Sequence, residues 1–347
     1  MNSNIDYVEL YEREKQKEIR KTFSRFMLAL SLLTIVAYAV IYLVEFILIM
    51  KMGASEVTLL LDNIYIQWAF GVGPMYLFGV PVLYLVVMKM KTAPREKKRL
   101  SAKDFFAIFL ICQGVTFVGS LIGQTFTAAL GEIFGKDITA GATDLVEKSP
   151  VWLTLAIAVI LGPVIEELIF RKLLIDRISR YGDLTAIITS GIAFGIFHGN
   201  FEQLFYAVLI GFVLAFVYTK TGNVLHTILL HIFINFMGST VALPVMQASN
   251  RVMEASEILV GGGTIDLKQF TLDTMLVTSY SVVQYAMVFA GLFILFRAIL
   301  KKKIEITNNS AVYVKGGRMC QNAILNFGTV LFLVLSFILF VAGILLS

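Results

Sequence analysis

Charged residues are scarce in this chain, and their scarcity limits the kinds of protein it can be. Of its 347 residues, 15% are charged and 58% are hydrophobic, and the mean hydropathy is +0.81. An ordinary soluble domain carries about 25% charged residues. Runs of about 18 or more mainly apolar residues, which are typical of membrane-spanning helices, recur along the chain. The composition excludes a large soluble domain and predicts an all-α, polytopic integral membrane helical bundle.

Cysteine is equally scarce. Cys112 lies in an apolar run and Cys320 in a basic loop, and neither has the spacing of a metal or redox site. A disulfide framework is therefore excluded. The net charge of +5 comes from clusters of Lys and Arg near the predicted helix ends. We expect these clusters to contact the anionic lipid of a bilayer, and we expect no nucleic-acid partner.

The apolar runs predict about nine transmembrane helices. Residues 1–22 precede the first run and are expected to form a short amphipathic segment in the cytoplasm. The nine predicted spans are residues 24–50, 68–88, 104–130, 152–180, 184–200, 204–219, 224–245, 275–299 and 323–346. The chain thus divides into the segment 1–22, three N-terminal helices with their loops (23–149), a core of four helices (150–245), and a loop with two C-terminal helices (246–347).

The loops of this predicted bundle alternate in charge. Lys and Arg together number six, seven, four, one and six in residues 1–25, 89–103, 171–182, 220–223 and 297–318. The intervening loops, residues 51–67, 131–151, 198–203 and 246–274, hold one, two, none and two. Cytoplasmic loops carry the excess of positive charge. The counts predict a multi-pass cell-membrane protein with a cytoplasmic N-terminus, and its length and uncleaved basic N-terminus favour a bacterial plasma membrane.

Two adjacent carboxylates and an arginine interrupt the fourth apolar run, as Glu166, Glu167 and Arg171. Ionisable groups at membrane depth are costly and by default mark a functional site that faces the bundle interior or a water-filled cavity. Glu167 and Arg171 are four residues apart with the acid first, so we expect them to pair and to offset their burial. Glu166 is left without that partner. Burial disfavours the charged form of a lone carboxylate, which suits a general base.

Helix geometry predicts that polar groups from three helices meet. Glu166 lies sixteen residues before the turn at Gly182, and His198 lies sixteen residues after it. In an antiparallel helix pair both therefore lie roughly 24 Å from the turn. His231 and Asn235, four residues apart, share one face of the seventh predicted helix. We expect these four side chains to converge.

Pro163 lies about one helical turn before the two glutamates. A proline inside a helix removes one backbone donor and frees a carbonyl. Freed backbone groups at membrane depth are tolerated where they line a water-filled cavity. We therefore expect a water-accessible kink next to Glu166.

The patterns Glu166-Glu167-x-x-x-Arg171, Phe194-x-x-x-His198 and His231-x-x-x-Asn235 occur in this order within residues 150–245. Together they resemble the motifs of the CPBP family (CAAX protease and bacteriocin-processing, or Abi) of intramembrane endopeptidases, which includes the type II CAAX prenyl endopeptidases. The resemblance implies a hydrolase that acts on peptide bonds, with a peptide or protein substrate at the membrane.

The resemblance also implies roles for the residues of the motifs. Glu166, with His198, would activate a water molecule to attack a peptide carbonyl. His231 and Asn235 would donate hydrogen bonds to the oxyanion that forms. Glu167 and Arg171 would hold the site in shape, and Phe194 would pack beside His198.

A metal-dependent version of the same protease is an alternative. Glu166, His198 and His231 are a possible ligand set for one divalent metal, with zinc as the first candidate and water as the fourth ligand. The chain has no His-Glu-x-x-His motif. Asn235 is a poor zinc ligand but a good oxyanion donor. We therefore favour a glutamate mechanism that requires no cofactor over a metalloprotease.

Two functions without peptide cleavage are further alternatives. A proton-coupled transporter would use Glu166 and His198 as a relay. A non-catalytic membrane scaffold or immunity protein would keep the fold and tolerate Glu166→Gln. Neither the substrate sequence, nor the cleavage site, nor the oligomeric state follows from the residues.

Overall fold

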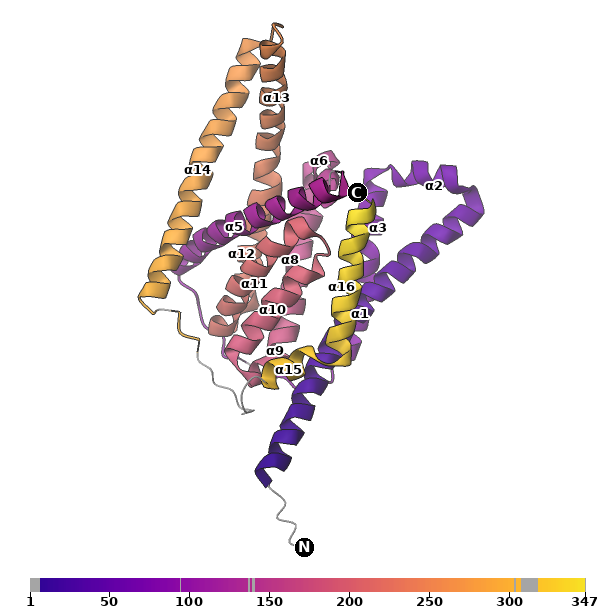
Figure 1. The fold of residues 1–347 in the computed structure, drawn as a ribbon, viewed down its shortest axis with the longest axis vertical. Helices are drawn as coiled ribbons and strands as arrows, with labels where there is room; N and C mark the ends of the chain where they lie inside the picture. Colours follow the sequence, from indigo (N-terminus) through magenta and orange to yellow (C-terminus); the bar gives the residue numbers. More distant parts are fainter. Residues whose placement is uncertain are drawn as a thin grey trace.

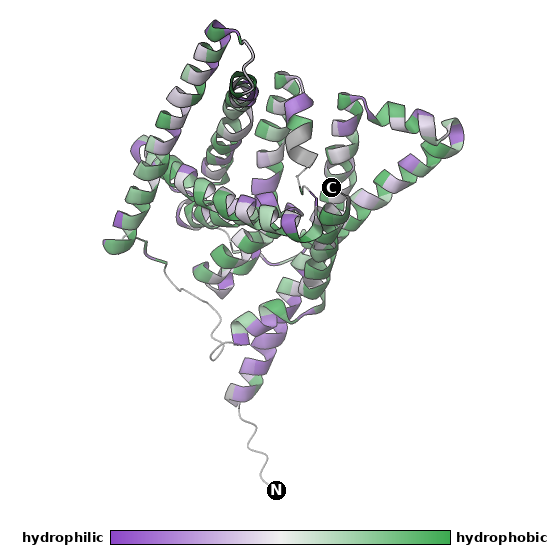
Figure 2. Cartoon of the chain, turned by 45° about the horizontal axis from the view of Figure 1, so that its top comes forward, coloured by the Kyte–Doolittle hydropathy of each residue, from purple (hydrophilic) through white to green (hydrophobic). Residues whose placement is uncertain are grey.

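The computed structural model describes residues 7–93, 95–136, 138, 141–302, 304–306 and 318–346. Every regular element in these ranges is a helix, as predicted (Figure 1). The first six residues of the predicted cytoplasmic segment lie outside the described part of the chain. The rest of that segment forms the start of α1 (Tyr7–Met52), whose hydrophilic N-terminal portion projects beyond the apolar bundle (Figure 2).

Within the described residues, eight helical stretches are long and apolar enough to cross a membrane. They are Glu9–Met52, Ile64–Val87, Ala102–Phe134, Val151–Tyr181, Phe201–Thr221, Val224–Val260, Leu267–Leu300 and Phe327–Leu345. The remaining predicted span is present as α10 (Asp183–Phe197), a helix of only 15 residues. At about 1.5 Å per residue it is about 22 Å long, which is less than the roughly 30 Å of a hydrocarbon core. The predicted cytoplasmic N-terminus stays a prediction.

The N-terminal elements surround the core helices on two sides. After α1 come α2 (Ala54–Leu61), α3 (Ile64–Pro74), the π-helical η1 (Met75–Gly79), α4 (Val80–Val87), α5 (Ala102–Phe134) and α6 (Gly141–Lys148). The C-terminal elements are α13 (Ala242–Val260), α14 (Leu267–Leu300), α15 (Arg318–Ile324) and α16 (Phe327–Leu346). α1 packs against α4, α15 and α16, whereas α5 packs against α11 (Phe201–Thr221) and α14. α13 and α14 form a hairpin that projects from one end of the molecule (Figure 1).

The core is a run of helical segments that repeatedly changes its winding. It comprises α7 (Val151–Thr154), the π-helical η2 (Leu155–Leu161), α8 (Gly162–Glu167), the π-helical η3 (Leu168–Ile175), α9 (Asp176–Ile178), the 3₁₀ turn η4 (Ser179–Tyr181), α10, α11, α12 (Val224–Asn235) and the π-helical η5 (Phe236–Val241). π-helical turns are rare and occur often at functional sites. Two of them directly flank the segment that holds both glutamates.

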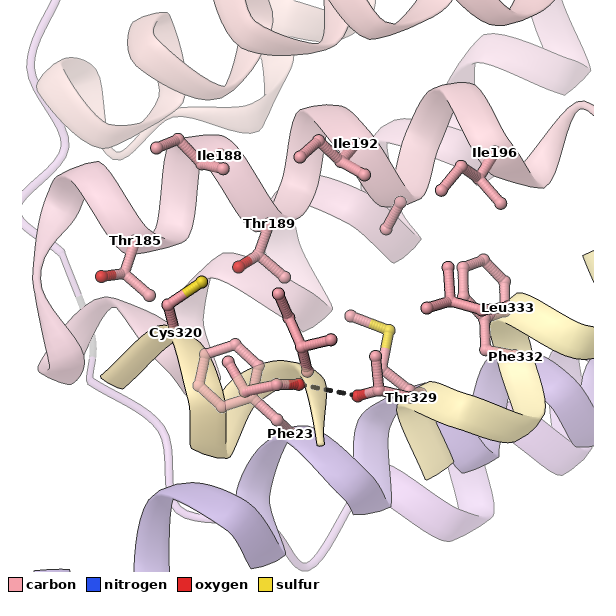
Figure 3. A pocket seen from close by; sticks show the side chains of 14 residues that line it. Phe23, Thr185, Ile188, Thr189, Ile192, Ile196, Cys320, Thr329, Phe332 and Leu333 are labelled. Carbon is pink, nitrogen blue, oxygen red and sulfur yellow. Dashed lines mark hydrogen bonds between the residues drawn. The ribbon is translucent and has the colours of Figure 1, made fainter. Parts of the chain in front are cut away.

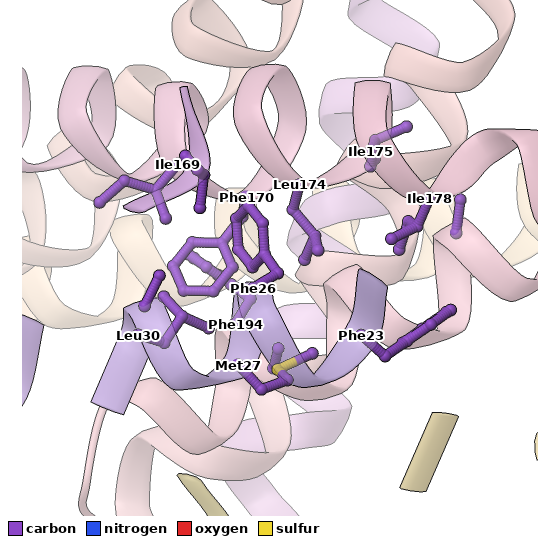
Figure 4. Packing of buried hydrophobic residues seen from close by; sticks show 14 of the residues in the cluster. Phe23, Phe26, Met27, Leu30, Ile169, Phe170, Leu174, Ile175, Ile178 and Phe194 are labelled. Atoms are coloured by element: carbon purple, nitrogen blue, oxygen red, sulfur yellow. The ribbon is translucent and has the colours of Figure 1, made fainter. Parts of the chain in front are cut away.

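A buried apolar cluster joins the core to α1 (Figure 4). Phe26 and Leu30 of α1 pack against Phe170 and Leu174 of η3 and against Phe194 of α10, and all of these side chains are at most 1% exposed. Between membrane helices the gain comes from close van der Waals packing, because lipid tails are as apolar as the side chains themselves. The cluster therefore holds η3 and α10 in fixed positions behind the site.

Candidate active site

The winding of the helix before the glutamates leaves one backbone carbonyl free. The Gly162 N–H donates to Ile157 O, as in a π-helix, and so bypasses Ala158 O. The next N–H in line would belong to residue 163, which is proline. Asn235 supplies the missing donor, with its Nδ2 2.9 Å from Ala158 O. Pro163 thus frees a backbone group as predicted, and a residue of the third motif satisfies it.

Glu167 and Arg171 form the predicted ion pair. Arg171 Nε lies 3.1 Å from Glu167 Oε2, and both side chains are 0% exposed. Ser190 of α10 contacts both Arg171 and the backbone of the helical segment that carries Arg171. Arg171 Nη1 is 3.3 Å from Ser190 Oγ, and the Ser190 hydroxyl donates to Phe170 O at 2.9 Å. Both charges are therefore fixed deep in the bundle, and neither faces the space in which a substrate would lie.

His231 lies between the two glutamates. Its Nδ1 is 3.1 Å from Glu167 Oε1, and its Nε2 is 3.7 Å from Glu166 Oε2. An ionised carboxylate only accepts hydrogen bonds, so Nδ1 carries the proton in the contact with Glu167. In a neutral ring this leaves Nε2 as the acceptor on the side of Glu166. Glu167 thus sets the orientation of His231 toward Glu166.

Phe194 is surrounded by the other charged and aromatic groups of the site. Its ring centroid lies 4.9 Å from that of His198 and 5.5 Å from that of His231, and both contacts are edge-to-face. The Arg171 guanidinium lies 4.7 Å from the centre of the Phe194 ring. Phe194 therefore packs beside His198 as expected and also spaces the two histidines apart.

His198 is held by its own helix. Its Nδ1 donates to Phe194 O at 2.8 Å, because a carbonyl oxygen can only accept. In the neutral ring Nε2 is then left with its lone pair. His198 caps the end of α10, where Gly199, at φ +67°, allows the chain to turn toward α11.

The four residues predicted to converge line one cavity of about 650 Å³. Glu166, His198, His231 and Asn235 all border it, and the Glu166 side chain is 19% exposed there. Glu166 contacts His231, whereas the predicted distances from the turn at Gly182 had paired Glu166 with His198. His226, the third histidine, lies in the first turn of α12, where its Nε2 is 3.4 Å from Asn223 Nδ2, and it is not part of this lining.

Sequence reasoning missed several polar residues that also border the cavity. Tyr76 comes from η1, Gln124 from α5, Tyr206 from α11, and Ser239 from η5. None lies in one of the three motifs. The only available signal was the presence of polar residues in otherwise apolar runs, and it does not say which helices become neighbours.

Among the residues that the structure describes, no three His, Cys, Asp or Glu side chains are grouped closely enough to hold a metal ion. Nδ1 of His198 and Nδ1 of His231 are engaged by a carbonyl and a carboxylate, which leaves Nε2 of each ring open. Metal-ligating histidines commonly donate their other ring N–H in this way. The metal set of Glu166, His198 and His231 and the mechanism without a metal both stay predictions.

A separate, apolar cavity of about 270 Å³ lies against α10, where α1, α15 and α16 meet it (Figure 3). Ile188, Ile192 and Leu333 line it, and Thr329 donates its hydroxyl to Ala323 O at its edge. Its only ionisable side chain is that of Cys320. This cavity has no group suited to acid–base chemistry.

Comparisons with known proteins match the region that holds the three motifs. Residues 148–237 match the family model described as "Type II CAAX prenyl endopeptidase Rce1-like". The chain is 25% identical over 190 residues to the "Putative membrane peptidase YdiL" of Bacillus subtilis (strain 168). The aligned region covers 53% of this chain and 77% of that relative. No solved structure matches the chain. The family model and this relative confirm the resemblance to the CPBP family of membrane proteases.

Proposed function

We propose that this chain is an intramembrane endopeptidase that hydrolyses a peptide bond in a membrane-associated or small peptide substrate. One observation carries the proposal: Glu166 and His231 face each other at 3.7 Å on the wall of a cavity between membrane helices. The buried Glu167–Arg171 pair behind them fixes His231. The family match over residues 148–237 supports the coarser assignment to a membrane protease.

In the proposed reaction Glu166 is the general base. A water molecule bound between Glu166 and Nε2 of His198 attacks the peptide carbonyl while Glu166 takes its proton. The new C–O bond gives a tetrahedral oxyanion. Glu166 then returns the proton to the amide nitrogen as the C–N bond breaks, which leaves a carboxylic acid and an amine; the acid then loses its proton to the amine.

Asn235 and His231 are the proposed donors to the oxyanion. An amide carries two N–H donors, and Ala158 O uses only one of those of Asn235. The other is free to point into the cavity. Because Nδ1 of His231 keeps its proton for Glu167, Nε2 donates to the oxyanion in the doubly protonated ring. Donors fixed in advance at the point where negative charge develops are among the strongest contributions to catalysis.

The test is peptide cleavage by Glu166→Gln. This change keeps the shape of the side chain but removes its basicity, and loss of a general base costs about 10²- to 10⁴-fold in rate. We expect purified wild type to cleave members of a peptide library and Glu166→Gln to lose at least 100-fold of that rate. His226→Ala is the matched control, because His226 lies outside the cavity lining.

The same assay tests the metal alternative. For the glutamate mechanism we expect a chelator to leave the rate unchanged. Loss of activity with chelator and its recovery with zinc would instead support the metalloprotease. Full cleavage activity in Glu166→Gln would contradict the proposed role of this residue and favour another base.

A further inference from the structure

α10 ends inside the bundle. It begins at Asp183, whose carboxylate pairs with Arg95 in a basic loop, and it runs for 15 residues. At about 22 Å it falls roughly 8 Å short of the opposite face of a hydrocarbon core. The turn at residues 198–200 therefore lies at membrane depth. Irregular backbone at such depth is tolerated where it is buried in protein or lines a water-filled cavity.

The space beyond this turn is hollow. The site cavity meets a second cavity of about 680 Å³, and Gln124 and Glu202 line both of them. On α5 the lining runs from Thr116 in the site cavity to Glu132 in the second cavity, a distance of about 24 Å along the helix. The two cavities therefore form one passage along α5 that leads away from the basic loops.

At the opposite end of the bundle, the part of the chain that the structure describes forms a cover over the helix ends. The loop between α4 and α5 is bound across the helix ends, with Arg95 Nη1 2.6 Å from Thr219 O, Ala93 N 2.6 Å from Asp176 O, and Lys98 N 2.7 Å from Thr221 O. Along the helix from Glu166 toward this loop, side chains of the apolar cluster (Figure 4) are 0% exposed. They include Phe170, Leu174, Ile175 and Ile178.

We infer that the peptide reaches the site from the end opposite the basic loops, through the passage between α5 and the α10–α11 turn. By the charge rule this is the extracytoplasmic end. The substrate class that follows is a peptide segment displayed on the outer side of the membrane, such as an exported peptide or the outer part of a membrane-attached one. The identity of the ligand rests on the proposed protease function, whereas the route rests on the cavities and its sidedness on the loop charges.

The passage also sets a minimum length for the substrate. From Gln124 to Thr116 the lining of α5 covers eight residues, or about 12 Å of helix. An extended peptide covers about 3.3 Å per residue. About four substrate residues therefore lie between the junction at Gln124 and Glu202 and the deep part of the site.

Cysteine accessibility tests the route. In a Cys320→Ser background, single cysteines are placed at Gln124 and, as a matched control, at Ile122, which lies two residues away on the opposite face of α5 and is 45% exposed. Native Cys112 remains, because it is 0% exposed. A membrane-impermeant maleimide is added to intact cells or to inverted vesicles. Gly261→Cys, in the α13–α14 hairpin, and Lys301→Cys, at the end of α14, report the two sides.

We expect Gln124→Cys to react from the same side as Gly261→Cys, at least tenfold faster than Ile122→Cys. Reaction only from the side of Lys301→Cys, or at the rate of Ile122→Cys, would overturn the route. Ala128→Cys, in the second cavity, is a second probe if Gln124→Cys fails to fold. Labelling does not require peptide cleavage. If the passage is labelled as expected but the wild type cleaves no peptide, the proposed function fails while the route stands.

The substrate class has its own readout. Modification at Gln124→Cys is expected to block cleavage of peptides added from the outer side. Cleavage that continues at the unmodified rate after complete labelling would show that substrate takes another path.

Discussion

At the scale of single residues, the Glu167–Arg171 pair is the strongest determinant of the site's shape. Both side chains are 0% exposed, so neither charge is solvated once its partner is lost. Breaking a buried pair by removing one partner costs about 3–5 kcal/mol, whereas replacing both partners by apolar residues is often neutral. We expect Arg171→Met to lower the midpoint of thermal unfolding in detergent, and the double variant Glu167→Leu/Arg171→Met to recover most of that loss.

The double variant separates stability from catalysis. It lacks the Glu167 carboxylate that holds Nδ1 of His231, so we expect it to be folded but at least tenfold less active. An active double variant would show that Glu167 does not position His231. A double variant as unstable as Arg171→Met would show that the two charges do not compensate each other.

Local spacing accounts for the part of the site that could be predicted from the sequence. The Glu167–Arg171 pair follows from a separation of four residues on one helix, whereas the packing of Phe194 beside His198 was implied by the family resemblance. The contacts of His231 with both glutamates join residues more than sixty positions apart. They depend on how α12 packs against α8, which no local pattern specifies.

At the scale of helices, the approach of α10 to α11 sets the position of His198. The two helices meet where Gly211 faces Gly191, and a Cβ on Gly211 would lie 2.8 Å from the Gly191 Cα. That contact is with backbone, which cannot move aside as a flexible side chain would. Small residues permit this approach in membrane helix pairs.

We therefore expect Gly211→Ala to destabilise the protein by about 1–3 kcal/mol, as overpacking commonly does. Gly343→Ala in α16 is the matched control, because nothing lies within 4 Å of its added Cβ. The control should be neutral or slightly stabilised by the better helix propensity of alanine. Equal thermal midpoints for the two variants would contradict a close contact between α10 and α11.

The apolar runs predicted where the helices lie but not where they are π-helical. Each predicted span has a helix in the structure, because length and hydropathy determine where a chain can cross a membrane. The π-helical turns on both sides of Glu166 and Glu167 were not predicted beyond the kink expected at Pro163. They depend on partners from other helices: Asn235 donates to Ala158 O in η2, and Ser190 donates to Phe170 O in η3.

At the scale of the whole molecule, the contacts of Arg95 show how the short helix α10 fits into the order of membrane crossings. Arg95 pairs with Asp183 at the start of α10 and donates to Thr219 O near the end of α11. Both ends of the α10–α11 hairpin therefore lie on one face of the bundle. α10 thus counts as one pass of the chain although it is too short to cross alone, which reconciles eight long spans with the charge pattern of nine.

This argument makes a prediction about sidedness. Reporter proteins fused after Gly182 and after Gly222 should both be cytoplasmic, because these two turns flank the hairpin whose ends Arg95 joins, and basic residues gather there. A reporter fused after Gly261, in the α13–α14 hairpin, should lie outside. An enzyme that is active only after export, compared with a protein that fluoresces only in the cytoplasm, measures this directly. Opposite locations for the Gly182 and Gly222 fusions would mean that α11 crosses without α10. The turn at residues 198–200 would then have to lie on the same face as Gly182, and the passage along α5 would lead to the cytoplasm instead.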